Sequence, residues 1–320
     1  MTVGIDIGTT SVKAVAADGD GRVLARSRVT RPLLARHAGE LAHDARSSWR
    51  DGVIEALGQV VAGRDGGPLD VRGVNVAAMV PSLCAVDDDG IPVSDGLLYG
   101  DARGEGGDPA ADPASSGELV RFLEWLAREH PDAGGYWPAQ AVANHALSGT
   151  AAIETTVAMT TLPLFDFQGW DAAVAAKAGV DDIARLPMIV VGTEPVGRVH
   201  HAAGAPLGGG TIDALAEQFV AGADHDGDVL VILGSTLIVW AVIPEWREAA
   251  GVWTVPHTAP GKSLIGGPSN AGGLFVGWAS RMLAGSTDTP VDPQRVPVWQ
   301  PYLRGERVPL HDPNRRASLH

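Results

Sequence analysis

The sequence predicts an α/β protein built from two domains. Residues 2–17 read as two strands joined by a glycine–threonine turn, and segments with apolar residues at helical spacing alternate with further strands. The strand–turn–strand pattern recurs, because "IDIGTTSVKAVA" (5–16) and "VILGSTLIVWAV" (231–242) align without a gap. A chain of 320 residues is long enough for two cores. We therefore expect two related domains.

The N-terminal part is expected to begin with three strands. A turn at 18–21, Asp-Gly-Asp-Gly, separates the first two strands from the third. The pattern then predicts a helix over 46–63, strands over 71–79 and 82–87, and helices near 117–130 and 136–148. Gly149 closes the last of these helices, and the stretch 104–116, rich in Gly, Pro and Ala, is expected to be a loop.

The C-terminal part is expected to continue with a helix and the second hairpin. "TIDALAEQFVAGA" (211–223) has the helical pattern, and Thr211 is predicted to be its N-cap. A strand–turn–strand segment follows over 229–243. Its apolar run is interrupted by Gly234-Ser235-Thr236 and is too short to span a bilayer.

The composition argues against several kinds of partner. A net charge of −14 leaves little basic surface for nucleic acid or for an anionic membrane. Cys84 is the single cysteine, which excludes an internal disulfide, and its apolar neighbours indicate a buried core residue. The N-terminus lacks the basic start and apolar stretch of a signal peptide. We therefore expect a cytoplasmic protein.

The two turns have the chemistry of phosphate-binding sites. A glycine lets the backbone approach a ligand closely, and successive N–H groups in such a turn form a nest for an anion. Thr9, Thr10, Ser235 and Thr236 add hydroxyl donors. Asp6 precedes only the first turn and would suit a magnesium ion beside the β- and γ-phosphates. Taken alone, each turn is equally well explained as a tight turn that needs glycine and threonine.

Further segments follow these turns in a recognisable order. They are "GIDIGTTSVKAV", "GELAHDARSSW" (39–49), "VSDGLLYGDAR" (93–103), "ALSGTAAIETTVAM" (146–159), "APLGGGTIDALAEQFVAGADHDGDVLVILGST" (205–236), "GGPSNAGGLFVGW" and "PYLRGERVPLHDPNRRA" (301–317). Together they resemble the FGGY carbohydrate kinases, members of the actin/Hsp70/hexokinase-like superfamily. The resemblance covers essentially the whole chain, and the order of the segments makes it specific although no single segment is.

The resemblance implies a fold and an activity. The fold would be ribonuclease H-like (actin/hexokinase-like ATPase), with a sugar-binding and catalytic domain over 1–226 and an ATP-binding domain over 227–320, facing each other around a cleft. The implied reaction is ATP-dependent phosphorylation of a sugar or polyol hydroxyl, as in a pentulose kinase, with ATP and Mg²⁺. The chain ends at His320, before the family's adenine-binding motif and several helices, so we expect the second domain to be incomplete.

The resemblance also implies roles for individual residues. Asp213, in the first turn of its predicted helix, would be the general base for the sugar hydroxyl and a ligand of Mg²⁺ together with Asp6. The implied sugar-binding residues are Val80, Pro81, Asp101, Arg103 and Asp213. The implied nucleotide-binding residues are Gly8, Thr9, Thr10, Lys13, Gly234, Ser235 and Thr236. As alternatives, Asp101 and Arg103 would form a structural ion pair, and Asp213 would be an ordinary acidic residue at a helix start.

The sugar and the assembly stay open. Xylulose kinases read Met-His-Gly where this sequence reads Val80-Pro81-Ser82. The expected partners are a small sugar or polyol and ATP, with no nucleic acid and no membrane, and a homodimer is left open. The alternative function is a non-catalytic or truncated sugar-binding relative of the sugar kinases. A chaperone or filament ATPase is weaker, because it needs neither the segment with Asp101 nor the context of Asp213.

Overall fold

A computed structural model gives the structure of the chain. It describes residues 1–37, 40–62, 70–99, 101–104, 118–191, 194–234, 237–257, 261–269, 271–283, 292, 294, 298–302, 305–306, 308–312 and 314–319. The described residues up to Ala216 form one compact unit, and those from Glu217 onward form another. The division between these units lies inside helix α6 (Asp213–Ala221). The domains expected over 1–226 and 227–320 stay a prediction. The functional roles assigned to the two domains stay predictions.

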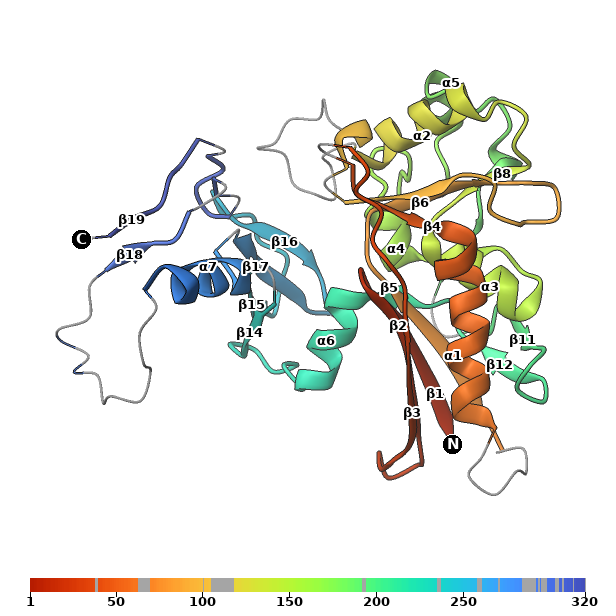
Figure 1. The fold of residues 1–320 in the computed structure, drawn as a ribbon, viewed down its shortest axis with the longest axis horizontal. Coiled ribbons are helices and arrows are strands. Elements are labelled where there is room, and N and C mark those ends of the chain that lie inside the picture. The colour runs from red at the N-terminus through yellow and green to blue at the C-terminus, as the bar shows by residue number, and fades with distance from the viewer. Residues whose placement is uncertain are drawn as a thin grey trace. The chain divides into compact units, whose positions relative to one another are not determined.

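The first unit is built on a mixed sheet (Figure 1). Its strands are β1 (Thr2–Ile7), β2 (Ser11–Ala17), β3 (Val23–Thr30), β5 (Gly73–Ala78), β11 (Gly197–Val199), β12 (Ala205–Leu207) and β13 (Thr211–Ile212). The order is β11-β12-β5-β1-β2-β3, and β13 also pairs with β5. β1, β2 and β3 form the predicted antiparallel meander, whereas β1 and β5 are parallel.

Among the described residues before α6, this unit also contains two smaller sheets and five α-helices. The small sheets contain β4 (Ala42–Asp44), β7 (Asp95–Leu98), β6 (Ser82–Val86) and β8 (Gly135–Trp137), and β9 (Ala152–Glu154) with β10 (Met188–Val190). The helices are α1 (Gly52–Val61), α2 (Glu118–Glu129), α3 (Ala139–Ser148), α4 (Thr155–Met159) and α5 (Ala172–Lys177). A π-helical turn (Arg46–Asp51) precedes α1, and 3₁₀ turns cover Ala102–Gly104 and Ile183–Arg185. None of the described helices is long and apolar enough to cross a membrane.

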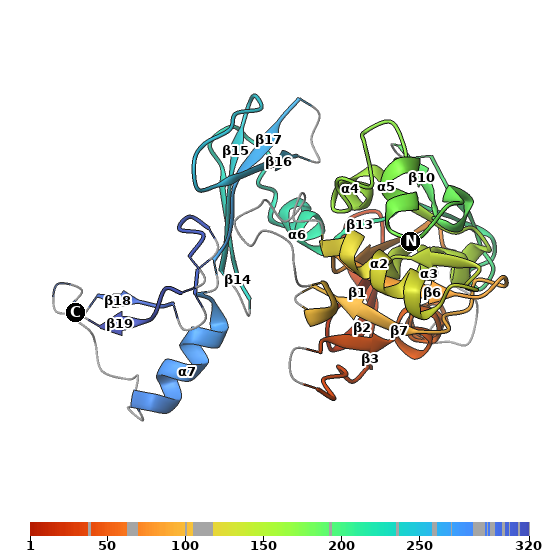
Figure 2. The same ribbon diagram turned by 90° about the horizontal axis from the view of Figure 1, so that it is seen from above.

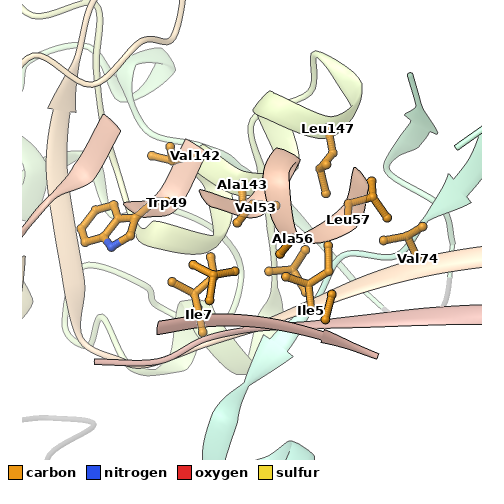
Figure 3. Close-up of a cluster of buried hydrophobic side chains, with 14 of the residues drawn as sticks. Ile5, Ile7, Trp49, Val53, Ala56, Leu57, Val74, Val142, Ala143 and Leu147 are labelled. Atoms are coloured by element: carbon orange, nitrogen blue, oxygen red, sulfur yellow. The ribbon is translucent and has the colours of Figure 1, made fainter. Parts of the chain in front are cut away.

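Helices α1 and α3 cover the main sheet with their apolar faces. Figure 3 shows their side chains converging on β1 and β5; the labelled members are Ile5, Ile7, Trp49, Val53, Ala56, Leu57, Val74, Val142, Ala143 and Leu147. The spacing of Val53, Ala56 and Leu57 places them on one face of α1. Cys84 is fully buried in the same cluster, as predicted, and burial raises the pKa of its thiol.

The second unit contains a four-stranded antiparallel sheet (Figure 2). Its strands are β14 (Val229–Leu233), β15 (Leu237–Ile243), β16 (Trp253–Pro256) and β17 (Ser263–Ser269), in the order β14-β15-β17-β16. Helix α7 (Gly273–Leu283) follows β17, and β18 (Trp299–Gln300) pairs with β19 (Ser318–Leu319).

The two similar hairpins have corresponding strand ends but different registers. β1 ends at Ile7 and β2 begins at Ser11, and the aligned positions Leu233 and Leu237 end β14 and begin β15. Ile7 pairs with Val12, whereas Leu233 pairs directly with Leu237. The second hairpin is therefore one residue tighter than the alignment predicts.

The structure corrects the predicted start of α6. Thr211 and Ile212 form strand β13 and pair with Ala77 and Ala78 of β5, so Thr211 is not an N-cap. The helix begins at Asp213 instead. Thr211 resembles a cap in sequence because a β-branched hydroxyl residue suits a strand as well as a helix start, and only the pairing with β5 decides between them.

Gly96 of β7 lies against the buried ring of Trp49. A Cβ atom at position 96 would overlap the six-membered ring, coming within 2.9 Å of Cε2 and closer still to two other ring atoms. Trp49 is fully buried, and its Nε1 donates a hydrogen bond to His43 Nδ1 at 3.0 Å. The ring is therefore held in place.

We expect Gly96→Ala to lower the free energy of unfolding by about 2–3 kcal/mol, because the added methyl group overpacks a site that cannot expand. Gly4→Ala is the control, since a Cβ there meets nothing within 4 Å. It should change stability by less than about 0.5 kcal/mol. Urea denaturation of both proteins measures the difference, and equal stability would show that Trp49 moves freely.

Candidate functional site

Three parallel strand ends meet at one edge of the main sheet. Ile7 of β1 and Ile212 of β13 both pair with Ala78, the last residue of β5. The next residues along the chain begin the first phosphate-like turn, the segment 79–81 and helix α6. Ligands of open α/β sheets bind beyond the carboxyl ends of their strands. This edge therefore brings together residues of three predicted functional segments.

Alternation along β1 explains its lone carboxylate. Ile5 and Ile7 are buried in the core, so Asp6 lies on the opposite face of the strand. Lys13 of β2 is its register partner, and Lys13 Nζ lies 2.8 Å from Asp6 Oδ2. The side chain of Lys13 is 50% exposed and that of Asp6 is 38% exposed, so the carboxylate remains accessible.

The donor set at this strand end fits a magnesium ion. Mg²⁺ prefers oxygen ligands and is held by one or two carboxylates together with waters and phosphate oxygens. Asp6 supplies one accessible carboxylate, and its Oδ2 would lie 3.7 Å from a Cβ added to Gly8. The carboxylate thus lies against the first residue of the turn, where a phosphate would be held.

The first turn is closed and anchored by its own residues. Gly8 N donates to Ser11 O at 3.1 Å, and Thr9 Oγ1 lies 3.1 Å from the Tyr99 hydroxyl. Thr10 is exposed, and its carbonyl accepts from Arg31 N at 3.0 Å. The contact with Tyr99 links the turn to the segment that carries Asp101.

Asp213 begins α6 directly after β13. Its Oδ1 accepts a hydrogen bond from Ala214 N at 2.8 Å, and the carboxylate lies in the first helical turn, as predicted. A carboxylate is stabilised there by the helix dipole. The pairing of β13 with β5 thus determines where this carboxylate lies.

Gln140 of α3, which sequence analysis missed, ties these strands together. Its Nε2 donates to Val76 O of β5 at 2.7 Å and to Thr211 O of β13 at 3.2 Å. Gly210 has φ +99°, and a Cβ there would overlap the Gln140 amide. The sequence held one signal of this role, because Gln140 is a polar residue in the largely apolar helix "AQAVANHALS". Buried amides in such a helix need partners, and these turn out to be strand carbonyls.

Asp101 and Arg103 form a buried bidentate pair. Arg103 Nε donates to Asp101 Oδ1 at 2.7 Å, and Arg103 Nη2 donates to Oδ2 at 2.6 Å. Each carboxylate oxygen accepts a second bond, Oδ1 from Arg103 N at 2.9 Å and Oδ2 from Leu41 N at 2.7 Å. Asp101 is 1% exposed. Its carboxylate is therefore engaged in positioning Arg103.

The surroundings of this pair keep both groups charged. Burial by itself would raise the pKa of Asp101, but the hydrogen bonds from Arg103 and Leu41 outweigh it and lower that pKa. The guanidinium of Arg103 also lies 5.1 Å from the centre of the Trp125 ring and 3.7 Å from Glu40 Oε1. Two of its five N–H donors are used by Asp101, which leaves others to reach a ligand.

Val80 and Pro81 lie between β5 and β6 at the same sheet edge. Val80 is partly buried and packs against the cluster that also receives Ile212, the residue before Asp213. The predicted sugar-contact segment therefore packs against the same cluster as the strand that precedes the predicted base.

The second turn lies in the other unit. Gly234 O accepts a hydrogen bond from Gly273 N, the first amide of α7, at 2.7 Å. A Cβ at position 273 would come within 2.6 Å of the same oxygen, so the helix start approaches the turn closely. Ser235 and Thr236, predicted to bind nucleotide, lie outside the described residues.

The first third of the chain matches a known family. The model of the FGGY family of carbohydrate kinases, N-terminal domain, matches residues 1–107. A xylulose kinase from Staphylococcus epidermidis is 23% identical over 357 residues, which cover 100% of this chain and 71% of that protein.

Two solved structures have the same fold. The ligand-bound xylulose kinase from Lactobacillus acidophilus superposes with a TM-score of 0.82 at 19% identity, covering 99% of this chain and 71% of its own. Plasmodium falciparum glycerol kinase with ADP superposes with a TM-score of 0.78 at 15% identity. The match covers 100% of this chain and 72% of the glycerol kinase chain. These likenesses confirm the predicted actin-like α/β fold. Residues 1–107 thus match the N-terminal domain of the FGGY family of carbohydrate kinases, and the chain as a whole has the fold of the xylulose kinase and glycerol kinase structures.

Proposed function

We propose that the chain phosphorylates a hydroxyl of a sugar or polyol with ATP, and that Asp213 is the general base. The observation that carries this proposal is the shared edge of β1, β5 and β13. There the first phosphate-like turn, Val80–Pro81 and Asp213 follow residues that pair with one another. A phosphoryl donor, a hydroxyl acceptor and a base need this kind of proximity.

Asp213 would take the proton of the attacking hydroxyl. A carboxylate at a helix start is a weak base, because the dipole stabilises its charged form. In a loose phosphoryl-transfer transition state, however, the attacking oxygen has formed little bond and retains its proton until late. Position matters more than basicity for such a base. The pairing of β13 with β5 and the amide of Gln140 supply that position.

The phosphates would be held mainly by the backbone. The residues proposed for this role are Gly8, Thr9, Thr10 and Lys13, with Gly234, Ser235 and Thr236 in the second unit. Asp6 and Asp213 would hold Mg²⁺, which when bound neutralises charge on the phosphate oxygens. The exposed ammonium of Lys13 would offer a further positive charge beside Asp6.

Arg103 would recognise the sugar, with Asp101 as its support. A guanidinium locked by two parallel hydrogen bonds presents its remaining donors in a defined direction. Hydroxyl oxygens accept such donors. The packing of Arg103 over Trp125 adds to this orientation.

The test of the activity is ATP consumption by the 320-residue chain with Mg²⁺ and a panel of ketopentoses, aldoses and polyols. Transfer to one of them supports the kinase and identifies its acceptor. Sugar binding by calorimetry without any transfer would support the non-catalytic sugar-binding alternative instead.

We expect Asp213→Asn to lower kcat by about 10²–10⁴-fold, because the amide cannot accept the hydroxyl proton. The affinity for the sugar should change by less than about threefold, which calorimetry measures. Asp171→Asn is the matched control, since Asp171 caps α5 by accepting from Ala173 N and Val174 N, and asparagine caps equally well. Unchanged turnover in Asp213→Asn would remove the proposed base.

We expect Asp101→Asn to raise the KM for the sugar about tenfold or more, with a smaller effect on kcat, because Arg103 loses its bidentate partner. Asp51→Asn is the control, since it alters a partly exposed Arg50–Asp51 pair of 2.6 Å that lies between neighbouring residues. An equal KM in both proteins would show that Arg103 does not bind the sugar.

Asp101→Asn should also change how the stability of the protein depends on pH. The pKa of Asp101 is lowered in the folded chain, so its contribution to stability is complete above the pKa of the unfolded chain. This stabilising contribution is lost as the pH falls through the pKa that Asp101 has in the folded chain. The stability gap between the wild-type chain and Asp101→Asn should therefore be widest near neutral pH and narrow in acid. A gap that is constant with pH would mean that the carboxylate charge is not involved.

A further inference from the structure

A buried hydrogen-bonded relay ends at the first phosphate-like turn. Trp49 Nε1, in the π-helical turn, donates to His43 Nδ1 of β4 at 3.0 Å. His43 Nε2 lies 2.7 Å from Thr9 O, the carbonyl at the centre of the turn. Trp49 is 0% and His43 1% exposed. The relay therefore connects the core to a turn that reaches the surface.

The partners of His43 determine its tautomer. The indole N–H of Trp49 can only donate, so Nδ1 of His43 must be the unprotonated nitrogen. The proton then lies on Nε2 and is donated to Thr9 O. Burial lowers the pKa of His43, and the bond to Thr9, which would raise it, does not outweigh the burial. At neutral pH the ring is uncharged, and both of its nitrogens are used.

The direction of one carbonyl determines the direction of the next amide. In a trans peptide the C=O and N–H groups point in opposite directions. The Thr9–Thr10 bond is not among the cis peptides of this chain. Because the Thr9 carbonyl points to buried His43, the Thr10 N–H points away from the core. Thr10 itself is exposed, and its N–H faces away from His43.

The direction of the Thr9–Thr10 peptide matters if the turn is to bind an anion. If this peptide flipped, it would present the Thr9 carbonyl oxygen to the phosphate and repel it. Three other bonds hold the turn among the described residues: Gly8 N to Ser11 O at 3.1 Å, Thr9 Oγ1 with the Tyr99 hydroxyl at 3.1 Å, and Arg31 N to Thr10 O at 3.0 Å. None of these bonds involves the Thr9 carbonyl.

We propose that His43 is a positioning residue, which fixes the Thr9–Thr10 peptide so that the Thr10 N–H faces a bound polyphosphate. The proposal rests on the function proposed above, in which that polyphosphate is ATP. His43 acts through the turn and does not itself touch the ligand. Sequence analysis included it only within the segment "GELAHDARSSW" (39–49).

Two amide variants separate the two bonds of His43. The amide of glutamine reaches the position of Nε2, so His43→Gln keeps a donor for Thr9 O. The amide of asparagine reaches the position of Nδ1, so His43→Asn keeps an acceptor for Trp49 and loses the bond to Thr9. Calorimetry with MgATP on the full chain should show His43→Gln within about twofold of the wild type and His43→Asn weaker by about tenfold or more. Sugar affinity should be unchanged in both.

A spectroscopic measurement tests the relay without relying on catalysis. In ¹⁵N-labelled protein the His43 ring should show the neutral tautomer with the proton on Nε2. The amide resonance of Thr10 should move in His43→Asn and stay in place in His43→Gln. If His43→Asn does not fold, Trp49→Phe replaces it. Without the indole N–H, the His43 ring is no longer confined to the tautomer that donates to Thr9 O, so MgATP binding should weaken.

The outcomes distinguish this proposal from the function on which it rests. Equal MgATP affinity in the wild type and His43→Asn, equal losses in both amide variants, or an unchanged affinity in Trp49→Phe would overturn the role of His43. If the wild type binds no MgATP, the proposed function fails. The Thr10 resonance then decides about His43: a shift confined to His43→Asn supports the positioning role, and equal spectra of the two variants overturn it.

Discussion

The parallel pairing of β5 with both β1 and β13 is the constraint on which the candidate site depends. Ala77 and Ala78 are the shared partners, so the phosphate-like turn after β1 and Asp213 after β13 start from the same level of the sheet. Side chains alternate along a strand, so a slip of one residue would move Asp6 into the core and bury its charge. The core under α1 and α3 opposes that slip, because it requires Ile5 and Ile7 to face inward.

Buried polar groups hold the loops that leave this edge. Gln140 joins two strands, Asp101 locks Arg103, and His43 holds the turn, and each uses hydrogen bonds to backbone carbonyls or amides. Such groups add little net stability when compared with apolar packing, but they are costly to leave unpaired. They therefore specify one geometry of loops that an apolar core alone would leave free.

The charge of the protein is consistent with a site made of backbone donors. The chain has a net charge of −14 and only three lysines, Lys13, Lys177 and Lys262, yet the proposed substrate is a polyphosphate. N–H groups directed by buried contacts attract an anion without adding a mobile cationic side chain. The second hairpin has a similar turn sequence, but its strands pair in a register that is one residue tighter.

The sequence by itself determined the features that depend on local preference. Alternation predicted the strands of both hairpins, helical spacing predicted α1, α2 and α3, and the ordered motifs indicated the family and placed Asp213 at a helix start. Only the tertiary structure decided that Thr211 belongs to a strand, that Asp101 supports Arg103, and that Gln140 and His43 hold the site. The contacts of Gln140 and His43 join residues far apart in the chain, 71 positions for Gln140 and Thr211 and 34 for His43 and Thr9. Asp101 is two positions from Arg103, but it also accepts from Leu41 N, 60 positions away. Local patterns carry no record of such pairings, because burial creates them when the sheet and its helices assemble.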